Sequence, residues 1–276
     1  MKSRPVSRLA APLAVLAITL AFLLAGGVQA ETAGDVAYTP TEGQAGKDVV
    51  WVPTAQTLVD LMLDMAELQP GDRLVDLGSG DGRTVITAAK RGVPARGIEY
   101  NPDLVALSQR NAQAEDVADL ARFEEGDIFE VDFSEATVVT LFLLPELNMR
   151  LRPILLDMPP GTRVLSNTFA MEDWKPDATA EVGEGCINWC RALKWVIPAK
   201  VAGTWQLGDQ ELHLTQTFQM LDGTLRSGDR STPIADGRMN GTHIQFTVDG
   251  RHYAGQIAGN LMQGTIDGAG VWSATR

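Results

Sequence analysis

The chain has 276 residues, and its 23 Lys and Arg against 35 Asp and Glu give a formal net charge of −12. The hydrophobic fraction of 45% is enough for one large domain or two smaller ones, each with a buried core. Three of the basic residues, and no acidic ones, lie in the first thirty positions, so the remainder is more acidic still. Such a body is a poor candidate for binding the phosphates of a nucleic acid, and it attracts a cationic partner.

Residues 1–30 have the order of a signal peptide. Lys2, Arg4 and Arg8 are followed by an apolar stretch over 9–24 and by small residues at 26–30. The apolar stretch is shorter than the roughly 20 residues that a membrane span needs. We therefore predict cleavage before Glu31 and export to the periplasm or the exterior; the alternative is an uncleaved segment that anchors the exported body in the membrane.

The body divides into a linker and two regions of different pattern. Residues 31–47 are polar and without periodicity, which predicts a linker. Over 48–200, strand and helix patterns alternate: the expected strands cover 73–77, 95–99, 136–142 and 163–166, with a strand end at 123–127, and the expected helices start near 54, 83, 102 and 146. This alternation predicts an α/β fold with a doubly wound, mostly parallel, Rossmann-like sheet.

Residues 201–276 lack helical periodicity. Short stretches of alternating apolar residues are separated by turns such as Asp222-Gly223 and Asp249-Gly250. We predict a small antiparallel β domain or barrel. The three histidines, His213, His243 and His252, all fall in this region, where solvent-facing strand positions are expected for them.

The two cysteines, Cys186 and Cys190, lie four residues apart. In an exported protein such a pair can form a small disulfide loop; two free thiols are the alternative. A zinc site needs four ligands, and no histidine lies nearby in the sequence, so no metal is expected.

A glycine-rich loop follows the first expected strand of the α/β region. Asp76 precedes Gly78, Gly80 and Gly82, and a helix pattern starts directly afterwards. Glycines at a strand-to-helix turn let the backbone approach a ligand closely. The spacing is G-x-G-x-G and not the G-x-G-x-x-G of a dinucleotide fold, which favours a ligand without a pyrophosphate group. Asp76 is expected near a cationic end of that ligand.

Two more acids end the next two strands. Glu99 lies 21 residues after Gly78, where a carboxylate can accept hydrogen bonds from both hydroxyls of a ribose. Asp127 ends the following strand, where it can accept from the amino group of an adenine while Ile128 packs against the ring. The three strand ends together predict a nucleoside site.

With these motifs, residues 48–200 resemble the class I S-adenosylmethionine-dependent methyltransferases. More narrowly they are similar to the seven-stranded protein-lysine methyltransferases, namely the mitochondrial ATP-synthase c-subunit lysine methyltransferase group and, more distantly, the histone methyltransferases called disruptor of telomeric silencing. The resemblance rests on the motifs at 52–54, 76–83, 97–102 and 144–146. It implies S-adenosyl-L-methionine as cofactor and N-methylation of a protein lysine.

The resemblance also suggests which residues contact the acceptor. Trp51, Pro53 and Thr54 are expected to line its channel; packing in the core is the alternative for Trp51. A second group is expected to act on the acceptor amine: Thr140 orients it, and Glu146, next to Pro145 at the following turn, attracts the cationic side chain before it loses its proton. For Glu146, an acid that stabilises a helix N-terminus is the alternative.

The chain departs from these families at the acceptor side. Thr140 stands where the histone enzymes carry Asn, and Leu143-Leu144-Pro145-Glu146 replaces the Asn/Asp-Pro-Pro-aromatic motif of many amino-methylating enzymes. The β region after 201 has no counterpart in them. Methylation of a small molecule or a lipid, and a non-catalytic nucleoside-binding module, therefore stay open as alternatives.

Overall fold

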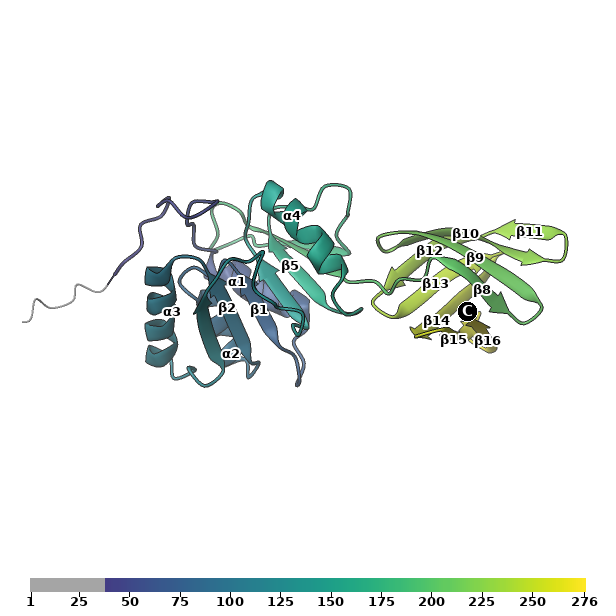
Figure 1. Ribbon diagram of the computed structural model, residues 1–276, viewed down its shortest axis with the longest axis horizontal. Helices are drawn as coiled ribbons and strands as arrows, with labels where there is room; N and C mark the ends of the chain where they lie inside the picture. Colours follow the sequence, from purple (N-terminus) through teal and green to yellow (C-terminus); the bar gives the residue numbers. More distant parts are fainter. Residues whose placement is uncertain (1–37) are drawn as a thin grey trace, which may run out of the picture. The chain divides into compact units, whose positions relative to one another are not determined.

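The computed structural model describes residues 38–276 (Figure 1). The predicted signal peptide 1–30 and the first part of the predicted linker lie outside the described residues. Within the described range, no helix combines the length and the apolar character needed to cross a membrane.

The first sheet has seven strands in the order β3-β2-β1-β4-β5-β7-β6. They are β1 Leu74–Leu77, β2 Ala95–Glu99, β3 Ala121–Glu125, β4 Val138–Leu141, β5 Arg163–Asn167, β6 Ala178–Glu181 and β7 Arg191–Val196. Strands β1 to β5 are parallel, while β7 runs antiparallel to both β5 and β6. The predicted doubly wound, mostly parallel sheet is confirmed; β6 and β7 were not predicted.

Helices cover both faces of this sheet (Figure 1). They are α1 Gln56–Ala66, α2 Arg83–Lys90, α3 Pro102–Ala114 and α4 Pro145–Leu156. Successive strand residues point to opposite faces. Leu74 and Val138 therefore pack with α1, α2 and α3, whereas Val75 and Val139 pack with α4. Both faces are buried, which explains why the strands are short apolar runs.

The second sheet is antiparallel and closes on itself. Its strands are β8 Gly203–Leu207, β9 Gln210–Thr217, β10 Met220–Ser227, β11 Arg230–Pro233, β12 Ala235–Asn240, β13 His243–Val248, β14 Arg251–Ala258, β15 Leu261–Ile266 and β16 Gly270–Thr275. The order runs from β10 through β12–β16 to β8 and β9, and β9 pairs again with β10. This closure buries a core that includes Trp205, Phe246 and Trp272, and it leaves few unpaired strand edges. The predicted small antiparallel β domain is confirmed, and it forms a barrel.

Candidate functional site

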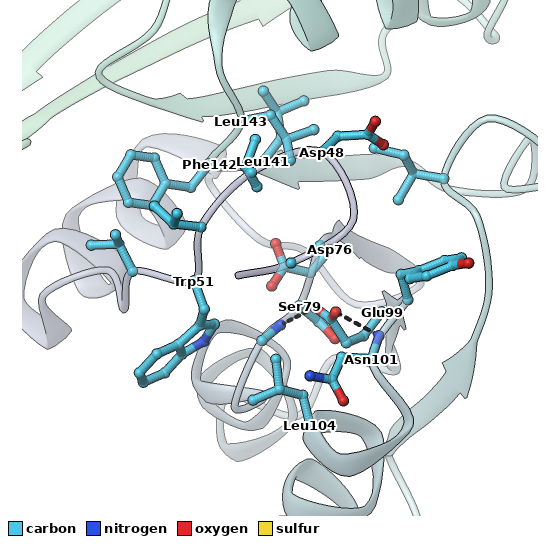
Figure 2. Close-up of a pocket in the computed structure, with 18 of the residues that line it drawn as sticks. Asp48, Trp51, Asp76, Ser79, Glu99, Asn101, Leu104, Leu141, Phe142 and Leu143 are labelled. Atoms are coloured by element: carbon cyan, nitrogen blue, oxygen red, sulfur yellow. Dashed lines mark hydrogen bonds between the residues drawn. The ribbon is translucent and has the colours of Figure 1, made fainter. Parts of the chain in front are cut away.

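A cavity of about 240 Å³ lies at the carboxyl ends of the parallel strands, the edge at which ligands of open α/β sheets bind. The loops after β1, β2, β3 and β4 contribute to its wall, together with residues 44–54, which precede the first helix. Figure 2 shows Asp76 in the middle of the cavity, with Glu99 and Asn101 on one side of it and Trp51 and Phe142 on the other.

The glycine loop that follows Asp76 forms part of the cavity wall. Gly80 has φ +55°, and a Cβ there would lie 2.7 Å from Nε1 of Trp51. Gly82 has φ +83° at the start of α2, and a Cβ there would lie 2.7 Å from the ring of Phe123. Only glycine fits these two positions, because both the left-handed backbone and the close neighbours exclude a side chain. The loop backbone is thereby brought to the cavity, where Gly78 and Gly80 are lining residues and Gly82 is not.

Glu99 has both carboxylate oxygens in hydrogen bonds with the backbone. One oxygen accepts from the N–H of Gly80 at 2.9 Å and the other from the N–H of Asn101 at 2.9 Å. Each carboxylate oxygen can accept more than one hydrogen bond. Glu99 is therefore held in one orientation at the cavity and keeps the capacity to accept from two hydroxyl groups.

Asp76 is buried at the end of β1, where the hydroxyl of Thr140 donates to it at 2.6 Å. Burial raises the pKa of the Asp76 carboxyl from 3.8 to about 7, and the nearby negative charges of Glu99 and Asp81 act in the same direction. The hydrogen bonds from Thr140 and Thr84 oppose this rise in pKa. A cationic group in the cavity would favour the ionised form of Asp76.

Asp127 is paired with a lysine from the segment that was expected to be a linker. Its carboxylate accepts from Nζ of Lys47 at 2.5 Å and from the N–H of Phe129 at 2.9 Å. These two hydrogen bonds, the one from Lys47 first, lower the pKa of the Asp127 carboxyl. The Lys47 ammonium also lies 4.8 Å from the centre of the Tyr100 ring. The described part of the predicted linker thus contributes to the site, and Ile128 lines the cavity beside Asp127.

The three predicted channel residues, Trp51, Pro53 and Thr54, all line the cavity. The carbonyl of Thr54 accepts from the Arg83 guanidinium at 2.8 Å, and its hydroxyl accepts from the Asn167 amide at 3.3 Å. These contacts attach the segment before α1 to both α2 and β5.

The residues predicted to act on the acceptor amine lie elsewhere. Thr140 is fully buried behind Asp76, and Pro145 and Glu146 are exposed in the first turn of α4; none of the three is a lining residue of the cavity. Their roles stay predictions. Thr140 can act through Asp76, and Glu146 lies where the helix dipole favours an acid.

Several lining residues were not anticipated from the sequence. Lys47, Ser79, Phe142, Phe169 and Trp189 all belong to the cavity wall. Of these five residues, only Ser79 lies within a motif identified in the sequence, the glycine-rich loop. Cys186 and Cys190, two residues of the segment that carries Trp189, are joined by a disulfide. In the part of the chain that the structure describes, no group of three His, Cys, Asp or Glu side chains is placed to hold a metal ion.

The residues present fit S-adenosylmethionine. Ser79 has a buried hydroxyl without a hydrogen-bond partner in the cavity wall, which a polar ligand can satisfy. Glu99 and Asp127 offer acceptors for a ribose and an adenine, and Asp76 offers a carboxylate for a cationic amino-acid end. Apolar side chains such as Leu104 and Ile128 lie beside these acids and can pack against a base.

Comparison with known proteins agrees with this fit. Residues 76–178 match the family model of the ANTKMT methyltransferase domain. The chain is 41% identical over 143 residues to a protein-lysine N-methyltransferase of Saccharolobus islandicus (strain REY15A), a match that covers 51% of this chain and 89% of the relative. The chain therefore belongs to the same methyltransferase family as this Saccharolobus islandicus protein. It is an S-adenosylmethionine-dependent methyltransferase, as the sequence motifs predicted.

Two further similarities bear on the acceptor. The ATP-synthase c-subunit lysine N-methyltransferase of Rattus norvegicus is 39% identical over 136 residues, which are 49% of this chain and 62% of the rat protein. The crystal structure of an RNA methyltransferase from Salinibacter ruber in complex with S-adenosyl-L-homocysteine is 47% identical, with a TM-score of 0.51, and the match covers 54% of this chain and 96% of that one. These relatives share the cofactor domain and carry names with different acceptors.

Proposed function

We propose that this methyltransferase N-methylates a lysine side chain of an acceptor protein. The observation that carries the proposal is the similarity to a protein-lysine N-methyltransferase over 89% of that relative's length. The negative net charge supports a cationic acceptor, because the chain has 35 acidic residues and only 23 basic ones. Asp48, an exposed acid in the cavity wall, adds a negative charge at the site itself (Figure 2).

The cavity walls suit an amine that must react in its neutral form. When bound, S-adenosylmethionine supplies a methyl group on a positively charged sulfur. A lysine ammonium has an ordinary pKa of about 10.4, and it must release a proton to the solvent before its nitrogen can form a bond to that methyl group. The buried side chains of Leu141 and Leu143 exclude water from one wall of the cavity. Such a wall lowers the pKa of an ammonium group and so favours the neutral amine.

The rate of methyl transfer also depends on how the donor and the acceptor are positioned. Methyl transfer is an in-line displacement, so the acceptor nitrogen has to be held opposite the leaving sulfur. Asp76 and Glu99 would hold the donor on one side, since Thr140 orients the Asp76 carboxylate and backbone N–H groups orient that of Glu99. Trp51, Phe142 and Phe169 border the space that is left.

A transfer assay with three acceptor classes tests the proposal. A chain of residues 31–276 is incubated with methyl-labelled cofactor and, separately, with envelope proteins, RNA and a lipid extract of the host. We expect label in protein, located by mass spectrometry on the lysine ε-nitrogen and absent with Glu99→Ala. Label in RNA instead would favour the activity named for the Salinibacter ruber relative, and label in the lipid extract would favour the small-molecule alternative.

We further propose that the enzyme works outside the cytoplasm. The basic, apolar and small-residue order of 1–30 supports export, and the disulfide between Cys186 and Cys190 fits an oxidising compartment. Fractionation of the host with a reporter fused to the C-terminus tests this, together with mass spectrometry of the mature N-terminus. A cytoplasmic protein that retains residues 1–30 would overturn the proposal.

A further inference from the structure

The disulfide loop between β6 and β7 contributes an aromatic residue to the cavity. Cys186 and Cys190 close the loop, and Trp189, one of its members, lines the cavity. The match to the methyltransferase family model ends at residue 178, before this loop. Ile187, another residue of the same loop, is 95% exposed and does not line the cavity. The loop therefore presents one particular side chain, that of Trp189, to the site.

Trp189 belongs to an aromatic wall with Phe142 and Phe169. The rings of Phe142 and Phe169 are stacked with centroids 6.0 Å apart, and those of Phe142 and Trp189 are 5.9 Å apart. All three line the cavity, and Trp189 is still 40% exposed. A partly exposed aromatic group at a cavity wall is accessible to a side chain that enters from outside.

The strand order places this aromatic wall away from the nucleoside acids. Glu99 ends β2 and Asp127 follows β3, whereas Phe142 and Phe169 follow β4 and β5, and Trp189 precedes β7. In the order β3-β2-β1-β4-β5-β7, these two groups lie on opposite sides of β1 and Asp76. Figure 2 shows the same separation between Glu99 and Phe142. The aromatic wall therefore borders the part of the cavity that the nucleoside leaves free, which is the acceptor side.

The two ends of the wall are held by different means. The carbonyl of Phe169 accepts from the Asn148 amide at 3.0 Å and from the Ser166 hydroxyl at 2.8 Å, which fixes it to α4 and β5. Trp189 has the left-handed φ of +54°. Because this backbone conformation is unfavourable for a side chain as large as Trp, the surrounding structure must impose it. The disulfide bond spans Trp189 and is the covalent constraint that can do so.

We propose that the loop closed by Cys186 and Cys190 selects the methyl acceptor by holding Trp189 against its cationic side chain. An ammonium group is attracted to the face of an aromatic ring, most strongly to that of Trp. This contact is made first, at the partly exposed end of the aromatic wall; the side chain then passes Phe142 and Phe169 and loses its proton in the apolar part of the cavity before it reacts. The inference rests on the proposed lysine methylation, and it adds a specificity-determining residue and the constraint that positions it.

The first test separates acceptor binding from cofactor binding. Envelope-protein extract serves as acceptor, and the extract concentration that half-saturates methyl transfer is measured for Trp189→Ala, Trp189→Phe and the control Ile187→Ala. We expect Trp189→Ala to raise that concentration roughly tenfold. Trp189→Phe keeps an aromatic ring and should give a value close to that of the wild type, and Ile187→Ala should equal the wild type. Calorimetry should give the same affinity for S-adenosylhomocysteine in all four proteins.

The second test asks whether the disulfide acts through Trp189. The double substitution of Cys186→Ser and Cys190→Ser removes the disulfide. It should raise the half-saturating concentration when Trp189 is present and have no further effect in a protein that already carries Trp189→Ala. An equal rise in both backgrounds would mean that the disulfide acts independently of Trp189, and no rise in either would mean that it serves stability alone; each result would overturn this part of the inference.

Failure of the inference and failure of the proposed function give different results. If the wild type transfers no methyl group to any protein in the extract, lysine methylation itself is wrong, and no variant is needed to see it. If the wild type does methylate protein and Trp189→Ala saturates at the same concentration, only the role of the loop is wrong. A loss of cofactor affinity in Trp189→Ala would also overturn that role.

Discussion

The two sides of the cavity are built in different ways. On the nucleoside side, Glu99 and Asp127 end consecutive parallel strands, and backbone N–H groups hold both carboxylates. On the acceptor side, Phe142, Phe169 and Trp189 come from three loops whose spacing in sequence follows no motif. The first side depends on local backbone geometry and the second on how distant loops pack. Cofactor binding should therefore respond sharply to single substitutions at strand ends, and acceptor binding to changes in loop constraint.

The largest effect is expected from Glu99→Ala. The variant should lose two charge-assisted hydrogen bonds to the ribose, and the bonds that Glu99 accepts from the N–H groups of Gly80 and Asn101 are lost as well. We expect S-adenosylhomocysteine to bind at least about a hundredfold more weakly, since hydrogen bonds to charged groups contribute roughly 1.5–3 kcal/mol each. Calorimetric titration measures this.

Two comparisons make the Glu99 prediction specific. Asp127→Ala should weaken the binding of S-adenosylhomocysteine less than Glu99→Ala does, because Asp127 offers one hydrogen bond to the adenine. Glu125→Ala, an exposed acid at the end of β3 that does not line the cavity, should change nothing. Equal losses for Glu99→Ala and Asp127→Ala would show that the ribose is not held by Glu99.

The second effect is a dependence on pH at Asp76. The pKa of this carboxyl is about 7 in the folded protein, against an ordinary value of 3.8. Between these values the folded state keeps a proton that the unfolded state has lost, so the free energy of unfolding falls as pH rises from about 4 to about 7 and then levels off. The full shift corresponds to roughly 4 kcal/mol.

Asp76→Asn removes this titration. The variant should melt higher than the wild type at pH 8, and the difference should shrink at pH 5, while its affinity for S-adenosylhomocysteine falls. In the wild type that affinity should rise as pH passes 7, because the ionised carboxylate attracts the cationic amino group. Melting curves whose difference does not change between pH 5 and pH 8 would contradict the raised pKa of Asp76.

The sequence predicted the cavity residues at the strand ends and those in the segment 51–54, but not the aromatic wall or Lys47, and the reason is physical. Asp76 and Glu99 belong to strands that the apolar pattern marks, and Gly80 lies in the turn between such a strand and a helix, so their neighbours in space follow from the topology. Lys47 and Trp189 reach the cavity from segments without periodicity, and no pattern in the sequence indicates where such segments pack. β6 was missed because its four residues are mostly exposed and carry no apolar alternation.

A third effect concerns the barrel. Every residue that lines the cavity falls within 44–189, so a chain of residues 38–200 should bind S-adenosylhomocysteine as the full chain does. It should melt at a lower temperature, because the buried Trp174 donates from Nε1 to Gln219 at 3.0 Å and stacks on Phe218. Exposing a large buried side chain costs about 1.5–3 kcal/mol.

A shorter chain of residues 48–200 provides the comparison. It lacks Lys47 and the three lining residues before it, so it should bind the cofactor more weakly than the chain that starts at 38. Loss of binding in both, with the fold intact by circular dichroism, would mean that the barrel contributes to the cofactor site.

The smallest effect is expected from Lys47→Met, which removes the ammonium group and keeps an apolar chain of similar length. The Lys47 ammonium holds Asp127 in place, but it is partly exposed, and ion pairs of that kind contribute little. We expect S-adenosylhomocysteine to bind about threefold more weakly at low salt and the difference to disappear near 1 M salt, where charges are screened. Lys90→Met, which breaks the exposed pair with Glu115 away from the cavity, is the matched control and should leave binding unchanged. Tighter binding in Lys47→Met would have the opposite meaning: the lysine would then compete with the adenine for Asp127, and the nucleoside side would have to open before the cofactor enters.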